Sequence, residues 1–399
     1  MSSQKIGVAT ATIVGMNAMI GSGIFAIPAS LALVAGPAGI LTILFVSFAV
    51  WFLASSMARL AYLYPQEGSF YTYAKQWGGH RMGVLSSGAY LIGLLVAMGL
   101  LAQMAGIHLQ HYFPGLDPQI LAVLTLIALT SLNVVGLTLS EIGQYILIFF
   151  TVFPLVITIL MCLTKIDFSL LTPFAPFGML SAFKASRAVI FAFFGFECAA
   201  SLFSIVKDPE KNVPKALTYS LTLVSVLYFL FATGIILSTP LDGFTDPSMP
   251  FSQILLKIFP NQGWVIELVH ISTLSAILGT IHSMIWSSSS LLITFVSALK
   301  NKTAKKFIGN KILNPKTSVV AIGSMILASC ISLKGLDWFF FITAACIVFA
   351  NITSMITLLT LPNEWKNGQN LKTVIGIGTA IVIWAFSIEG LVKVFSQLF

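Results

Sequence analysis

The stretch NAMIGSGIFAIP (residues 17–28) lies in the middle of the first long apolar run of the chain. Gly21 and Gly23 flank Ser22 there, and Pro28 follows five residues later. Glycine permits backbone dihedrals that a helix excludes, and proline removes a hydrogen-bond donor and disturbs the carbonyl one turn earlier. The pattern therefore predicts a helix broken at Gly21–Gly23, although a packing face of small residues would use the same glycines.

A break at this point would create a small polar site inside an apolar segment. The second half-helix would begin with unpaired N–H groups, which suit a carboxylate. The first half-helix would end in unpaired carbonyls, which suit an ammonium group. A compound that carries both groups, such as an amino acid, fits this arrangement.

The composition of the chain indicates a membrane protein. Of its 399 residues, 57% are hydrophobic and 9% are charged, and the mean hydropathy is +0.96. Soluble domains have about 25% charged residues, and this chain has too little polar surface to cover its apolar residues in water. Long continuous apolar runs favour helices over a membrane β-barrel. The first run has no clear cleavage site before it, so we expect a retained helix rather than a signal peptide.

A membrane crossing needs about 20 apolar residues in a helix. The short apolar segment at 251–259 cannot cross, and it predicts an interfacial or re-entrant helix. Eleven longer segments can cross, at 6–33, 38–63, 84–112, 119–139, 143–165, 184–206, 216–238, 264–298, 317–333, 338–361 and 371–396.

The positive charge of the chain, +8 in total, lies in the loops between these segments. With the N-terminus in the cytoplasm, fifteen basic residues fall on the cytoplasmic side and six on the other, which together are all 21. The positive-inside rule therefore predicts an inner-membrane protein with a cytoplasmic N-terminus. This distribution explains the charge without a nucleic acid partner.

A second break is predicted in the sixth segment, at FAFFGFEC (residues 191–198). Gly195 lies mid-helix, and Glu197 places an ionisable group in an apolar zone. Because a buried carboxylate is costly in a membrane, a functional or proton-handling role is expected for Glu197. A hydrogen bond that ties the unwound segment to neighbouring helices is the structural alternative.

The two breaks are five helices apart, which is the spacing of paired discontinuous helices in an inverted repeat of five plus five helices. We therefore expect an all-α polytopic fold with discontinuous first and sixth helices and about eleven spans. Its ten-helix transport core would occupy residues 1–361, with repeats at about 6–165 and 184–361. Residues 362–399 would add a loop and one more C-terminal transmembrane helix.

At these residues the sequence resembles the amino acid–polyamine–organocation (APC) superfamily, over roughly residues 6–361. The motif IGSGIF (residues 20–25) with Pro28 is similar to the first-helix signature of that superfamily. The loops YPQEGSFYTY (residues 64–73) and KDPEKNVPKA (residues 207–216) resemble those after its second and sixth helices. Within the superfamily, the chain looks most like the basic amino acid and polyamine antiporters, which include the arginine–agmatine exchanger.

The resemblance implies a substrate site at the two breaks. The substrate carboxylate would meet the Ser22 side chain and the backbone at Gly21 and Gly23, and the ammonium group would meet nearby carbonyls. Phe191 would close the site as an aromatic gate, and Glu197 would match the sixth-helix glutamate and support the site or carry a proton. The full set of substrate-binding residues implied is Met19, Ile20, Gly21, Ser22, Gly23, Ile24, Phe191, Phe194, Gly195 and Trp286, the last stacking on the substrate side chain.

The sequence also departs from the antiporter pattern. Phe191 stands where the exchanger has a tryptophan, which weakens the case for a guanidinium substrate. The third segment has no carboxylate or amide at 90–98, so this part of the site looks suited to an apolar side chain. The chain is one helix short of the usual twelve.

Several other polar residues have competing interpretations. The serines at 287–290 could complete a sodium site, but hydroxyls that bond back to their own helix are favoured. His282 and His270 could titrate, yet hydrogen bonds between helices are more common for such residues. Thr151 lies near the place where some relatives carry a lysine in place of sodium. The four cysteines have no pairing or metal-ligand spacing and read as small buried hydrophobes.

We therefore expect a secondary-active amino acid permease or antiporter that works by alternating access. The alternatives are a proton- or sodium-coupled symporter of neutral amino acids and a membrane receptor that does not transport. No cofactor, metal or enzymatic activity is expected, since the spans contain no nucleotide-binding motif and no catalytic constellation. The expected partners are a small amino acid or amine and the lipid bilayer, and a homodimer is compatible with the sequence.

Overall fold

The structure is a computed structural model, and it describes residues 5–21, 23–66, 69–203, 205–244, 251–299, 313–332, 336–362 and 370–396. These ranges form helices almost throughout, as expected for a chain that must satisfy its backbone groups within an apolar solvent. An isolated parallel bridge joins Ile6 to Val206.

The described ranges contain nine helical stretches that are long and apolar enough to cross a membrane. One of them runs from Gly23 to Leu63 and joins three consecutive elements. The elements in these nine stretches are α2 (Gly23–Ala35), η1 (Gly36–Ala38), α3 (Gly39–Leu63), α4 (Ser69–Gln110), α5 (Pro118–Val135), α6 (Leu137–Leu163), α8 (Pro209–Ser238), α10 (Trp264–Ala298), α12 (Pro315–Ser332), α13 (Leu336–Leu359) and α15 (Asn370–Ser396).

The first and sixth predicted spans are divided, as their glycines indicate. α1 (Val8–Met19) precedes α2, and α7 (Met179–Phe191) precedes the 3₁₀ helix η3 (Phe196–Ser201). Each of the eleven predicted segments therefore corresponds to one helix or one divided helix. Short helices lie within the connecting loops, namely η2 (Phe168–Leu171), η4 (Leu241–Gly243) and α9 (Phe251–Ile258).

The expectation of a short helix at 251–259 is confirmed by α9, which buries Phe251, Ile254 and Leu255. α4 begins at Ser69, ahead of the third span, which the sequence predicts from about residue 84. Its first turns precede a kink at Gly79, where φ is 65°. Phe70 is buried there and Thr357 donates a hydrogen bond of 2.6 Å to the Tyr73 carbonyl, so tertiary packing supports a segment that is too polar to resemble a span.

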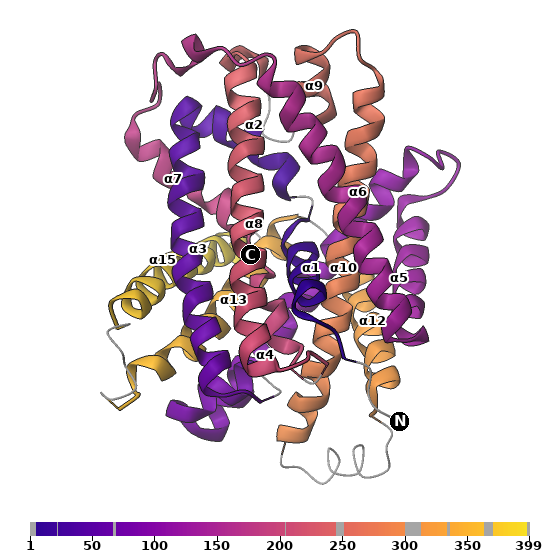
Figure 1. The fold of residues 1–399 in the computed structure, drawn as a ribbon, viewed down its shortest axis with the longest axis vertical. Helices are drawn as coiled ribbons and strands as arrows, with labels where there is room; N and C mark the ends of the chain where they lie inside the picture. The colour runs from indigo at the N-terminus through magenta and orange to yellow at the C-terminus, as the bar shows by residue number, and fades with distance from the viewer. Residues whose placement is uncertain are drawn as a thin grey trace.

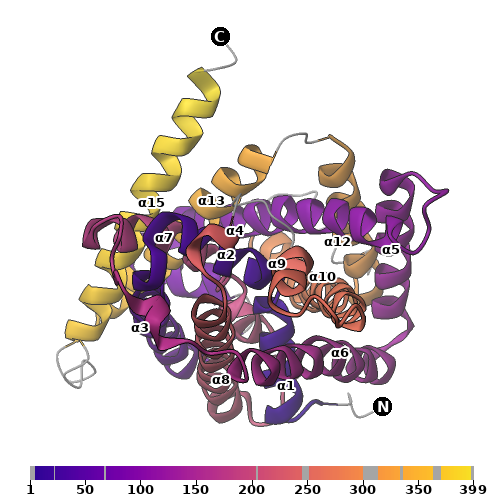
Figure 2. The same ribbon diagram turned by 90° about the horizontal axis from the view of Figure 1, so that it is seen from above.

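The divided helices lie inside the bundle. α1 packs against α6, α8, α10 and η3, while α2 packs against α7 and α8. In Figure 1, a short connection joins α1 to α2, which lies above it, and α8 packs against both helices. α15 packs on α3 and α13 at the edge of the bundle, and Figure 2 shows its C-terminal part extending beyond the other helices.

Candidate functional site

The first break lies between α1 and α2. α1 ends at Met19, and the Ile20 N–H still reaches the Met16 carbonyl at 2.8 Å. The Gly21 N–H then turns back to the Met19 carbonyl at 2.9 Å, and a new helix begins at Gly23. The predicted break at this position is confirmed. Ser22, to which the sequence assigned the carboxylate contact, lies outside the described residues.

The second break follows α7. The backbone leaves the helix after Phe191, and Gly195 adopts φ 106° and ψ −7° before η3 begins. A side chain is strained at such a positive φ, which explains why glycine occupies the position. The backbone of Phe191 ends the half-helix as expected, but its side chain lies outside the described residues. The role of Phe191 as a gate therefore stays a prediction.

The two breaks touch each other at their glycines. A Cβ atom on Gly23 would lie 3.1 Å from the Ala192 Cβ, which is tighter than ordinary packing. A Cβ atom on Gly195 would overlap the Ala18 carbonyl group and lie 2.8 Å from the Met284 Cε. Glycine is therefore required at Gly195, and at Gly23 it allows the closest approach of the two unwound segments.

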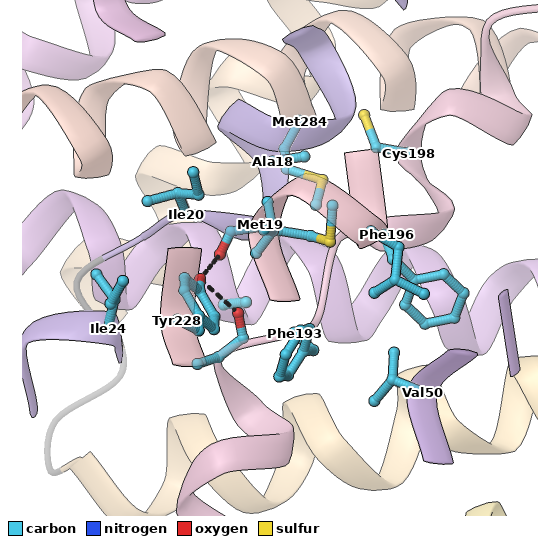
Figure 3. Close-up of a cluster of buried hydrophobic side chains, with 14 of the residues drawn as sticks. Ala18, Met19, Ile20, Ile24, Val50, Phe193, Phe196, Cys198, Tyr228 and Met284 are labelled. Carbon is cyan, nitrogen blue, oxygen red and sulfur yellow. Dashed lines mark hydrogen bonds between the residues drawn. The ribbon is translucent and has the colours of Figure 1, made fainter. Parts of the chain in front are cut away.

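Tyr228 of α8 joins the carbonyl ends of the two half-helices. Its hydroxyl lies 3.0 Å from the Met19 carbonyl oxygen and 3.0 Å from the Ala192 carbonyl oxygen (Figure 3). The side chain is 1% exposed, and its ring packs on Phe193 with centroids 5.1 Å apart. The ring of Tyr228 is thus held by Phe193 of the second break, and its hydroxyl is hydrogen-bonded to a carbonyl of each break.

Thr280 of α10 serves the first break from the opposite side. Its hydroxyl lies 2.8 Å from the Asn17 carbonyl oxygen and 3.2 Å from the Ile20 carbonyl oxygen. The sequence analysis missed Thr280 and Tyr228, since each is one of several hydroxyl-bearing residues in its long helix. It treated the carbonyls of Met19 and Ile20 as open to an ammonium group. In the structure these carbonyls already have hydroxyl partners, which a bound ammonium group would share or displace.

A buried amide network anchors α1 next to the break. Asn17 Nδ2 donates to Gln144 Oε1 at 2.6 Å and to the Gln144 carbonyl at 2.9 Å. Ser283 of α10 donates to the same Gln144 Oε1 at 2.9 Å. All three side chains are buried. The network therefore fixes the end of α1 against α6 and α10.

Glu197 is fully buried at the start of η3. Its Oε2 accepts a hydrogen bond of 3.3 Å from the Gly195 N–H. The carboxyl group therefore stabilises the turn of its own unwound segment. The hydroxyl of Tyr90 on α4 lies close to the carboxyl group. Neither Glu197 Oε1 nor Tyr90 Oη has a hydrogen-bond partner of ordinary geometry among the described residues. This leaves an acid and a phenol facing each other beside the break, and the role of Glu197 stays a prediction.

The walls around the breaks are apolar. Met19, Ile20, Ile24, Phe193 and Met284 are each at most 4% exposed, and Figure 3 shows them within and next to the two unwound segments. Among the described residues of the breaks, Glu197 is the only acidic side chain. The arrangement can therefore offer backbone dipoles and hydroxyls to a polar head and an apolar wall to the remainder of a ligand.

The other predicted site residues have contacts of their own. Gly21 lies beside Thr280, since a Cβ atom on Gly21 would be 3.3 Å from the Thr280 hydroxyl oxygen. Phe194 lines a pocket together with Phe193 and Phe196 at the second break, and Asn351 of α13 and Ala380 of α15 form part of its other wall. Trp286 lies near His282, with ring centroids 6.5 Å apart. Stacking of Trp286 on a substrate stays a prediction.

The serine run and His282 make the hydrogen bonds that their packing interpretations predict. Ser288 and Ser289 donate to carbonyls of the preceding helical turn. His282 lies 2.7 Å from Asn133 Nδ2 and 3.1 Å from the Ser140 carbonyl, so it links α10 to α5 and α6. The four cysteines carry no disulfide.

The sequence profile of the amino acid permease family matches residues 6–298. This chain belongs to the amino acid permease family. It is 25% identical over 299 residues to the branched-chain amino acid permease BcaP of Bacillus subtilis. This alignment covers 69% of this chain and 63% of BcaP. It is 26% identical over 298 residues to the mitochondrial cationic amino acid transporter 3 of Arabidopsis thaliana. This alignment covers 67% of this chain and 48% of that protein. The chain therefore spans less than two thirds of the length of these relatives.

Two solved structures share the fold. One is MhsT in complex with L-phenylalanine, with a TM-score of 0.69 over 98% of this chain and 100% of that chain. The other is a sodium-coupled sialic acid symporter, with a TM-score of 0.63 over 98% of this chain and 91% of that chain. Both are 14% identical to this chain, so they establish the fold alone.

Family and fold together identify an integral membrane protein of the APC superfamily with the inverted-repeat transporter architecture. Its relatives are transporters rather than enzymes. The family match thus confirms the superfamily named from the sequence motifs. The finer placement among arginine–agmatine exchangers stays a hypothesis, because the relatives include permeases for branched-chain as well as cationic amino acids.

Proposed function

We propose that this chain is a secondary-active carrier for amino acids with apolar side chains, which it binds between the broken first and sixth helices. The observation that carries the proposal is the contact between the breaks, where glycine backbones and two hydroxyls meet a wall of buried apolar side chains. The backbone of such a site recognises the zwitterionic head, and the wall accepts an aliphatic or aromatic side chain.

Three features support an apolar substrate over an arginine- or agmatine-like one. The side chains that surround the unwound segments are apolar, as Met19, Ile24 and Phe193 illustrate. Glu197, the acidic group beside the breaks, is fully buried and bonded to the Gly195 N–H. The branched-chain permease of Bacillus subtilis is among the relatives. We further propose a cytoplasmic membrane location with the N-terminus inside, in line with the distribution of basic residues.

Counterflow in vesicles tests the proposal directly. Vesicles that contain the purified protein are preloaded with unlabelled leucine. They are expected to accumulate far more external labelled leucine than protein-free vesicles, because the carrier exchanges internal for external leucine at one site. Arginine or agmatine counterflow without leucine counterflow would contradict the apolar assignment and support the antiporter hypothesis. Saturable leucine binding without flux in any gradient would instead indicate a receptor.

Proton-coupled symport is a second candidate, favoured by the buried carboxyl group of Glu197 beside Tyr90. Under this mechanism, Glu197→Gln keeps the shape of the site but removes the ionisable proton. We expect leucine uptake driven by a pH gradient to fall about 100-fold, while leucine counterflow, which needs no net proton movement, falls far less. Glu210→Gln, at the exposed start of α8, is the control. Unchanged gradient-driven uptake in Glu197→Gln would remove the proton role from this residue.

A further inference from the structure

Three histidines meet where the end of α4 lies against the start of α10. His108 is in the last turn of α4, His111 follows that helix, and His270 is near the start of α10. The His111 and His270 rings stack, with centroids 4.3 Å apart and 11° between their planes. The His108 ring lies edge-on to the His270 ring, with centroids 6.1 Å apart. We call these three side chains the histidine cluster.

One acidic side chain contacts the cluster in the part of the chain that the structure describes. Glu267 Oε1 lies 3.1 Å from His111 Nε2, and the Tyr112 hydroxyl donates to Glu267 Oε2 at 3.4 Å. One carboxylate can balance one imidazolium, so these contacts suit a cluster with a single charged ring. A second charged ring would lie next to the first without a counter-charge of its own. Like charges at such short range repel strongly.

His270 is the ring least suited to a charge. Its Nδ1 atom is buried and has no hydrogen-bond partner among the described residues. A neutral imidazole can leave this nitrogen unprotonated, but an imidazolium carries N–H on both nitrogens. A buried N–H without an acceptor costs free energy. The described residues contain no group of three side chains placed to hold a metal ion, so the proton is the ion that this cluster suits.

Other charged residues lie at the same end of the helices that pack against α4 and α10. The Asp117 carboxylate accepts a backbone N–H at the start of α5, and Lys257 of α9 donates to a backbone carbonyl. Lys165, after α6, is exposed, and the side chain of Asp337, at the start of α13, lies outside the described residues. Glu267 is therefore the charged group whose contact with the cluster is shown.

We propose that the histidine cluster is an acid-sensitive clasp, which holds the adjoining ends of α4 and α10 together while at most one ring is charged and releases them when more rings are protonated. Histidine has an ordinary pKa of about 6.5. The rings are mostly neutral above this pH, so the contact between the two ends is stable there. As the pH falls below it, protonation adds repulsion that only separation relieves.

Release of the clasp affects the region of the breaks, because the same two helices reach them. α4 carries Tyr90 beside Glu197, and α10 carries Thr280 beside Ile20. With the N-terminus in the cytoplasm, the clasp faces the outside of the cell. External acid then favours the conformation that is open to the outside. The release itself depends neither on the substrate nor on this topology.

A pair of spin labels measures the separation of the two ends directly. Ile107 and Ile271 are exposed and lie next to His108 and His270 in the chain, so cysteines at these two positions can carry the labels once the four native cysteines are replaced by alanine. We expect the distance between the labels to increase by about 2 Å or more between about pH 7.5 and about pH 5. The same pair with His270→Gln should show little or no increase, because the stacked rings no longer share a second charge.

Two further variants separate an acid-sensitive clasp from a general effect of acid. His80→Gln is the matched control, since His80 lies near the opposite end of α4 and contacts Tyr71 instead. It should keep the full pH response. Glu267→Gln should begin the increase at a higher pH, because even the first charged ring then has no carboxylate partner. An unchanged label distance in wild type, or the same increase in His270→Gln, would overturn the proposal.

A second measurement uses proteins without labels or cysteine replacements. Acid lowers the thermal unfolding midpoint of any protein through many groups, so the informative quantity is the difference between variants. We expect the midpoint to fall less in His270→Gln than in wild type and His80→Gln over the same pH range. Equal decreases in all three proteins would contradict the clasp. Both measurements are made without leucine, so a failure to bind leucine would count against the proposed function alone.

Discussion

Gly195→Ala is expected to lower leucine counterflow by about 100-fold while the protein still inserts in the membrane. A methyl group there would overlap the Ala18 carbonyl and lie 2.8 Å from the Met284 Cε. Because backbone lies on one side of the contact, the clash can be relieved only by separating the two breaks. The positive φ of 106° adds strain of about 1–3 kcal/mol for any residue with a Cβ. A shift of about 1 Å at a binding site can cost on the order of 100-fold in rate.

Gly178→Ala separates the two causes of this effect. Gly178 also has a positive φ, 80°, but a Cβ on it would meet nothing within 4 Å. Its alanine variant should therefore carry backbone strain without any clash at the breaks, and it should keep leucine counterflow within a few-fold of wild type. Equal counterflow in Gly195→Ala and wild type would contradict the contact between the breaks.

The positions of the helices could be predicted because a bilayer leaves few choices. Every backbone group in the apolar zone must be paired, so long apolar runs become helices, and the segment predicted at 264–298 coincides with α10. The breaks could be predicted for the same reason. Gly21–Gly23 and Gly195 stand out from packing glycines by their neighbours, since a serine lies between the first pair ahead of Pro28 and Gly195 is followed by Glu197 in an apolar span.

The partners of the breaks could not be predicted in the same way. Tyr228 is more than 30 residues from Ala192 and more than 200 from Met19, and nothing in the local pattern of α8 distinguishes it from a tyrosine that faces lipid. Its role depends on which face of α8 meets the breaks, and packing of distant helices decides that. The same holds for Thr280 and for the Asn17–Gln144 amide pair. The sequence shows a polar residue deep in an apolar helix. It does not show which distant group that residue contacts.

The structure also shows the contacts of polar residues for which the sequence left two interpretations open. The hydroxyls of Ser288 and Ser289 bond to their own helix, and His282 bridges α10 to the α5–α6 connection. These residues are polar because they satisfy local acceptors or join helices. Composition alone could not distinguish such roles from a sodium site or a proton site.

Gly23→Leu addresses the other glycine of the contact. Its Cβ would lie 3.1 Å from the Ala192 Cβ and 3.4 Å from the Ala192 Cα. A methyl group needs a shift of a few tenths of an ångström, so Gly23→Ala should weaken leucine binding moderately. The three further carbons of leucine have to enter the contact between the breaks and push the start of α2 away from Ala192. We therefore expect Gly23→Leu to bind leucine at least about 100-fold more weakly than wild type.

Gly378→Leu is the matched control for this change. Gly378 lies on α15, and a Cβ there would meet nothing within 4 Å. The same leucine side chain should be accepted at that position without loss of binding. Comparison of the two variants separates the effect of position from the effect of a larger side chain in a membrane helix.

Equilibrium binding of labelled leucine to purified wild type, Gly23→Leu and Gly378→Leu, each with a native unfolding transition, is the most direct test of a substrate site formed by the two breaks. We expect saturable binding to wild type and Gly378→Leu. We expect no measurable binding to Gly23→Leu at concentrations that saturate wild type. Normal leucine affinity in a folded Gly23→Leu protein would contradict the account, because the substrate could then not lie between the broken helices.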